Sequence, residues 1–130
     1  KGVIFNARSE SVMEKPMFRE CVRAGRCVIP AKGFYEWNRK KERFTFTLPE
    51  EDTLYLAGIC KQYPGERRFV ILTMQADEQM SPVHDRMPLI FRREQLWDWI
   101  LDGDQTLTLL RQRPPRLQKR TEYEQQVLPL

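Results

Sequence analysis

Hydrophobic and polar residues alternate along much of this chain with the period of two that is typical of β-strands. Arg43–Leu48 is the clearest case, because aromatic and leucine side chains fall on one face and arginine and threonine on the other. The same pattern predicts strands at Val3–Phe5, Arg26–Trp37 (interrupted by Pro30 and Gly33), Thr53–Gln62, Arg67–Gln75, Leu89–Phe91 and Tyr123–Leu128. A turn at Pro64-Gly65 is expected to join two of these strands.

Helical spacing is confined to a few short segments. The pattern predicts helices at Met13–Ala24, Arg93–Leu101 and Asp104–Arg111. In the second helix we expect Leu96, Trp97 and Ile100 to face the core, and the basic, proline-containing stretch Arg111–Arg120 to be a loop. Many strands with few peripheral helices predict an α+β fold built on a curved, barrel-like antiparallel sheet.

Length and charge narrow the class of protein. The 130 residues are typical of a single domain spanning 1–130. The net charge of +4 favours polyanionic partners, although only weakly. No apolar run approaches the roughly 18 residues of a membrane helix. We therefore expect a monomer that works in the cytoplasm or nucleoid, or in the nucleus of a eukaryote, and binds no membrane.

The sequence offers few metal ligands. Its three cysteines, Cys21, Cys27 and Cys60, have no CxxC spacing, and His84 is the single histidine. Metal sites need several clustered ligands, so we expect no metal and no cofactor. Free thiols in a reducing compartment fit better than a disulfide framework.

Three short motifs carry groups that could do chemistry. In "NARSE", Asn6 and Arg8 share one face if the segment is extended, because side chains in a strand alternate between faces. The alternative is a polar strand end.

In the second motif, "GFYEW", Glu36 lies between two aromatic residues. Desolvation there would raise the pKa of Glu36 and suit it to acid–base catalysis. Trp37 could stack on a base or sugar. The alternative is a solvated Glu36 beside core aromatics.

The third motif is "SPVHDRMP", in which two prolines frame the lone histidine. Proline disfavours regular structure, so an ordered loop is expected to carry His84, Asp85 and Arg86. Histidine titrates near neutral pH, and arginine can bind a phosphate through two hydrogen bonds. The alternative is a structural histidine beside an Asp85–Arg86 ion pair. Together the three motifs supply the groups of an acid–base site for an anionic substrate.

In this order and spacing, "NARSE", "GFYEW" and "HDRMP", with Thr73–Ala76 ahead of the histidine, resemble the SOS-response-associated peptidase (SRAP) family. The resemblance implies binding to single-stranded DNA and a covalent crosslink to abasic sites. The family's nucleophile is an N-terminal cysteine, exposed when the initiator methionine removes itself, whose amine and thiol form a thiazolidine with the open-ring sugar.

Carried over by motif, the resemblance implies two sets of residues. The catalytic set is Asn6, Glu36 and His84, and the DNA-binding set is Arg8, Trp37, Thr73 and Arg86. Asn6 would orient the cysteine and the sugar, Glu36 would act as acid and base, and His84 would assist proton transfer.

The chain departs from the family at its start. Family members begin Met-Cys-Gly-Arg, whereas this chain begins Lys-Gly-Val, so we expect an N-terminally incomplete SRAP-like domain that does not crosslink alone. Two alternatives stay open. One is a non-catalytic binder of single-stranded DNA or a modified base. The other is a cysteine hydrolase that pairs Cys27 or Cys60 with His84 and Glu36.

Overall fold

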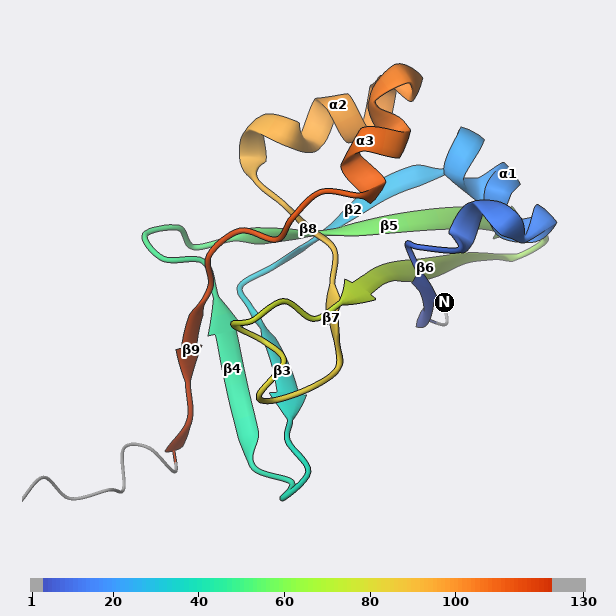
Figure 1. Cartoon of the computed structure of the whole chain (residues 1–130). Helices are drawn as coiled ribbons and strands as arrows, with labels where there is room; N and C mark the ends of the chain where they lie inside the picture. The colour runs from blue at the N-terminus through green and yellow to red at the C-terminus, as the bar shows by residue number, and fades with distance from the viewer. Residues whose placement is uncertain (1–3, 123–130) are drawn as a thin grey trace, which may run out of the picture.

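The computed structural model describes residues 4–122 and consists of two sheets with three short helices (Figure 1). The strands are β1 (Ile4–Arg8), β2 (Arg26–Ala31), β3 (Phe34–Trp37), β4 (Arg43–Thr47), β5 (Leu54–Tyr63), β6 (Glu66–Gln75), β7 (Arg86–Pro88), β8 (Ile90–Phe91) and β9 (Gln118–Arg120). The helices are α1 (Pro16–Ala24), α2 (Leu96–Leu101) and α3 (Thr106–Leu110), each preceded by a 3-10 turn: η1 (Val12–Glu14), η2 (Arg93–Gln95) and η3 (Gly103–Gln105). The strand predicted at Tyr123–Leu128 lies outside the described residues.

The larger sheet has the strand order β1-β6-β5-β2, with β7 and β8 added on β6 and β5. The long antiparallel hairpin of β5 and β6 confirms the turn predicted at Pro64-Gly65. The sheet is mixed, however, because β1 runs parallel to β6. A parallel pair needs a long crossover, and the chain between these strands passes through α1 and four other strands before it returns. The predicted sheet was antiparallel throughout, and the parallel pair of β1 and β6 corrects this point. The α+β class and the curved, barrel-like sheet are confirmed.

The segment predicted as one extended run, Arg26–Trp37, is divided between the two sheets. Its first half is the edge strand β2, which tolerates Pro30 because an edge strand has one side without ladder hydrogen bonds. Its second half, β3, belongs to the smaller sheet β3-β4-β9. Gly33 allows this change of direction, since a Cβ atom there would lie 2.5 Å from the carbonyl oxygen of Phe46. The presence of β9 corrects the loop predicted for Arg111–Arg120 over its last three residues.

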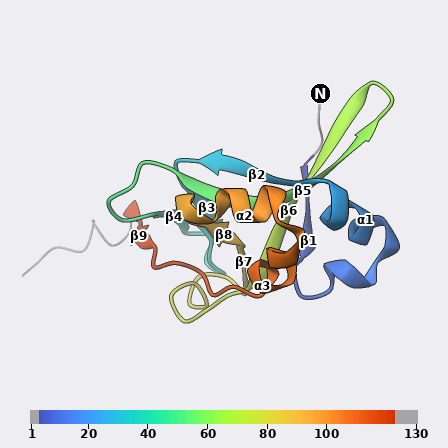
Figure 2. The ribbon, with the colours of Figure 1, turned by 90° about the horizontal axis from the view of Figure 1, so that it is seen from above.

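The helices cover the larger sheet, with α2 and α3 on one side and α1 beside β1 (Figures 1 and 2). The prediction that Trp97 faces the core is wrong, because this side chain is 67% exposed and Trp99 is fully buried. Leu96, Trp99 and Ile100 form the i, i+3, i+4 stripe of a helix, and Trp97 lies outside it. The indole N–H of Trp99 donates to the carbonyl of Cys27 at 2.8 Å, so the buried ring has its polar partner.

Candidate functional site

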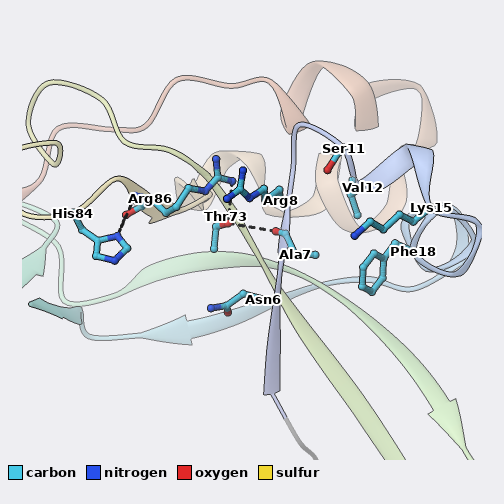
Figure 3. Close-up of a pocket in the computed structure, with 10 residues that line it drawn as sticks. All are labelled: Asn6, Ala7, Arg8, Ser11, Val12, Lys15, Phe18, Thr73, His84 and Arg86. Atoms are coloured by element: carbon cyan, nitrogen blue, oxygen red, sulfur yellow. Dashed lines mark hydrogen bonds between the residues drawn. The ribbon is translucent and has the colours of Figure 1, made fainter.

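The motifs meet around a cavity of about 410 Å³ between β1, the start of α1, β6, β7 and the loop of residues 81–85 (Figure 3). Arg86 begins β7, so the predicted loop ends one residue before it, because β7 pairs with β6. The lining residues of the cavity are Asn6, Ala7, Arg8, Ser11, Val12, Lys15, Phe18, Thr73, His84 and Arg86. Five of the seven residues that the sequence singled out are among them. The remaining two, Glu36 and Trp37, approach from β3 in the other sheet.

Asn6 and Arg8 belong to β1 and project from the same side of it, toward Arg86 and His84 (Figure 3). This is the shared face expected from strand alternation. Both side chains are exposed. Thr73 lies opposite Arg8 in the register of β1 with β6, which brings the two residues to one wall of the cavity. An amide and a guanidinium are therefore both free to meet a polar ligand here.

Arg86 has protein partners for its two terminal nitrogens. They donate to the two carboxylate oxygens of Glu10 at 3.0 and 2.8 Å, and Nη2 also donates to the Thr73 hydroxyl at 3.0 Å. Its Nε is buried and has no hydrogen-bond partner within residues 4–122. The expected phosphate contact of Arg86 stays a prediction, and its charge is paired with the Glu10 carboxylate.

The environment of Glu10 follows from this pair. Burial raises the pKa of Glu10, but hydrogen bonds from Arg86 and the amide of Gln75, together with the charge of Arg86, outweigh that effect and bring the pKa below its usual 4.5. Sequence reasoning assigned no role to Glu10, although it stands in the same motif as Asn6 and Arg8. Glu10 stands two positions after Arg8, and this spacing could have placed it on the same face as Asn6 and Arg8.

His84 is oriented by the backbone of its own loop. The amide N–H of Arg86 donates to Nδ1 at 3.0 Å, and Nδ1 also lies 3.3 Å from the carbonyl oxygen of Arg86. A single ring nitrogen cannot accept from one and donate to the other, and the shorter contact assigns Nδ1 as the acceptor. The proton of the neutral ring is therefore on Nε2.

Nε2 of His84 lies 3.9 Å from Oε1 of Glu36, so the two acid–base candidates converge although they belong to different motifs. Glu36 shares a face of β3 with Phe34 and is only 25% exposed, while Tyr35 and Trp37 point to the opposite, solvent-facing side. The structure therefore contradicts the alternative in which Glu36 is solvated and Trp37 is core. The distance is too long for a direct hydrogen bond and allows both groups to contact one substrate atom.

Two of the internal thiols, those of Cys21 and Cys27, are poorly suited to nucleophilic catalysis. Burial, reinforced by the neighbouring Cys60, raises the pKa of Cys27 to about 12, and burial also raises the pKa of Cys21. A thiol that stays protonated at neutral pH is a weak nucleophile. Residues 4–122 contain no group of three or more His, Cys, Asp or Glu side chains placed to hold a metal ion. None of the helices in this part of the chain is long and apolar enough to cross a membrane.

Comparisons with known proteins agree with the motifs and the fold. The family profile of the SOS response associated peptidase (SRAP) matches residues 1–126, and the chain belongs to this family. It is 34% identical over 106 residues to the abasic site processing protein YobE of Bacillus subtilis, covering 75% of this chain and 48% of that protein. It is 31% identical over 108 residues to the abasic site processing protein YedK of Escherichia coli, covering 77% and 48%.

Solved structures give the same relationship. A Bordetella bronchiseptica protein, 27% identical, superposes with a TM-score of 0.78 over 89% of this chain and 64% of that chain. A Bacteroides thetaiotaomicron protein, 25% identical, superposes with a TM-score of 0.77 over 89% and 57%. The chain spans about half the length of the bacterial relatives named above.

Proposed function

We propose that this chain provides the acid–base and phosphate-binding half of a protein that crosslinks itself to abasic sites in single-stranded DNA. The observation that carries the proposal is the convergence of Glu36 and His84 beside a cavity that also holds Asn6 and Arg8. The nucleophile is an N-terminal cysteine of the family type, which is absent from these 130 residues. The same cysteine becomes accessible through self-removal of the initiator methionine.

The chemistry uses the groups in the positions described. An abasic sugar is mostly a closed ring, so a base must take the proton of its C1 hydroxyl while an acid protonates the ring oxygen. Glu36 takes the proton of the C1 hydroxyl and passes it to the ring oxygen as the C1–O bond of the ring breaks, while the Nε2–H of the neutral His84 ring donates a hydrogen bond to that departing oxygen. The cysteine amine then adds to the aldehyde and loses water to give an imine. The thiol adds across the C=N bond, its proton passes to nitrogen, and a thiazolidine ring closes.

The cations and the amide position the strand. Arg8 and Lys15 line the cavity, and neither forms an ion pair within the described residues, so both can neutralise phosphates. Asn6 orients the sugar and the incoming cysteine. Thr73 and Arg86 add further contacts in the cavity, and Trp37 presents a ring that is 49% exposed for stacking. The raised pKa of Cys27 disfavours this residue as the nucleophile of an internal cysteine hydrolase.

The test is a denaturing gel with the complete protein and an oligonucleotide that carries one abasic site. We expect a covalent band that forms at least tenfold more slowly in Glu36→Gln, with reversible binding to an unreactive tetrahydrofuran analogue nearly unchanged. Glu51→Gln, an exposed carboxylate in a loop, is the matched control and should crosslink at the parent rate. Parent-like crosslinking by Glu36→Gln would refute the acid–base assignment. Reversible binding without any covalent band in the parent protein would favour the non-catalytic binder.

A further inference from the structure

A second groove of about 590 Å³ continues from the site on the far side of His84. It is lined by Trp37, Asn38, Arg39, Lys40, Glu42, Ser81, Pro82, Val83, His84 and Asp85. One wall is therefore the turn between β3 and β4, and the other is the loop that carries the histidine. Because His84 also lines the first cavity, a chain-like ligand can pass along one side of the imidazole from one depression into the next.

One residue, Asn38, holds the β3–β4 turn. Its side-chain oxygen accepts hydrogen bonds from the backbone amides of Lys40 at 3.0 Å and Glu42 at 2.9 Å. Its backbone carbonyl accepts a hydrogen bond from the backbone amide of Lys41 at 2.9 Å. Lys41 adopts a left-handed conformation with φ of 64°, which this network stabilises. A turn fixed in this way presents its cations in a defined place rather than on a mobile loop.

The cations of this turn, Arg39, Lys40 and Lys41, form no ion pair in the part of the chain that the structure describes. Two carboxylates also line the groove: Glu42 accepts a hydrogen bond from the Asn38 amide at 2.8 Å, and Asp85 is exposed on the other wall. The groove is thus of mixed charge. It suits a ligand that offers both phosphates and bases better than a bare polyanion.

We propose that the DNA strand whose abasic sugar enters the first cavity continues into this groove on one side only. Arg39 and Lys40 bind its next phosphates, and Trp37, on the same wall, stacks on the adjoining base. The inference rests on the proposed function, since it assumes that a single strand occupies the first cavity. It adds two phosphate-binding residues, which lie outside the three motifs, and a direction in which the strand leaves the reacting nucleotide.

The experiment measures reversible binding by the complete protein, using oligonucleotides that carry a tetrahydrofuran abasic analogue and are extended on only the 5′ or only the 3′ side. We expect the parent protein to gain affinity from an extension on each side. The double variant Arg39→Gln/Lys40→Gln should weaken binding about three- to tenfold for one set of oligonucleotides, either those extended on the 5′ side or those extended on the 3′ side. Its affinity for the other set should equal that of the parent protein. For the affected set, the slope of log K against log salt should fall by about 1.4, at about 0.7 per phosphate on a single strand.

The matched control is Arg111→Gln/Arg113→Gln, which removes two exposed cations just after α3, far from the β3–β4 turn (Figure 1). It should change neither set. An equal loss for both sets, or for neither, in Arg39→Gln/Lys40→Gln would overturn the inference. Crosslinking of a natural abasic site is measured in parallel, and a parent protein that forms no crosslink would reject the proposed function. A loss of reversible binding for oligonucleotides extended on one side only would still show that the strand runs through the second groove.

Discussion

The pair between Glu10 and Arg86 gives a prediction that can be worked out from the structure. Arg86 binds the Glu10 carboxylate through two hydrogen bonds, and its side chain is only 20% exposed, whereas Glu10 is 49% exposed. An exposed ion pair contributes at most about 1 kcal/mol, and removing one partner of a fully buried pair costs about 3–5 kcal/mol. After discounting for the solvent exposure of Glu10, we expect Glu10→Gln to lower the free energy of unfolding by about 1–2 kcal/mol.

The assay is urea denaturation of the complete protein at pH 7. The control is Glu20→Gln, which removes the carboxylate of an exposed i, i+3 pair with Arg23 and should leave stability unchanged. If both variants lose the same small amount of stability, the Glu10–Arg86 pair contributes no more than a surface ion pair, and the reasoning fails.

The Glu10–Arg86 pair also has a consequence for the candidate site. Since the Arg86 amide orients His84, loosening the Arg86 segment should also slow crosslinking more than it weakens binding.

The stability effect has a defined pH dependence. The pKa of Glu10 is lower in the folded protein than its usual 4.5, so folding favours the ionised carboxylate. Its contribution is therefore fully present above about pH 4.5 and is lost as the pH falls through the lowered pKa. The stability difference between the parent protein and Glu10→Gln should be constant from pH 5 to 8 and shrink below pH 4.5. A difference that grows on acidification would contradict this linkage.

The remaining predictions concern the core. Trp99→Phe should destabilise the protein by about 1–3 kcal/mol in urea denaturation, because it removes the hydrogen bond to Cys27 and leaves a void, while Trp97→Phe should change stability by less than about 0.5 kcal/mol. Equal effects would mean that the burial of the two indoles is misassigned. With a pKa of about 12, the Cys27 thiolate fraction at pH 8 is on the order of one in ten thousand, so iodoacetamide should label this residue far more slowly in the native protein than in urea, as measured by peptide mass spectrometry. Equally fast labelling in both states would show that the thiol is not shielded.

Much of the local structure could be predicted from the sequence. The alternation in Arg43–Leu48 and the turn at Pro64-Gly65 depend on neighbouring residues only, and both agree with the structure. The shared face of Asn6 and Arg8 follows from the period of a strand and needs no knowledge of the fold. The motifs also located most of the cavity wall, because chemistry-bearing residues are concentrated in short segments between prolines and glycines.

The errors arose where a local pattern allowed two outcomes. Trp97 and Trp99 both fall within a helical stripe, depending on where the stripe is centred. Trp99 is the buried ring because it packs against Phe91 and donates to the Cys27 carbonyl, and both contacts depend on the tertiary structure. The direction of β1 relative to β6 likewise depends on the path of the chain between them. The sequence analysis assigned no role to Arg39 and Lys40, because nothing in the sequence places this turn beside His84.

By itself, the sequence determined the α+β class, the main strand and helix segments apart from their ends, and the family motifs, since all of these depend on residues close together in the chain. It missed the short strands β7 and β9, which lie in segments predicted as loops. Tertiary structure alone decided the pairing of Glu10 with Arg86, which are 76 positions apart, and the approach of Glu36 to His84 from a different sheet. Contacts at such separations form only when the whole chain has buried its core. Periodicity and turn chemistry specify elements, whereas packing decides which elements, and therefore which functional groups, meet.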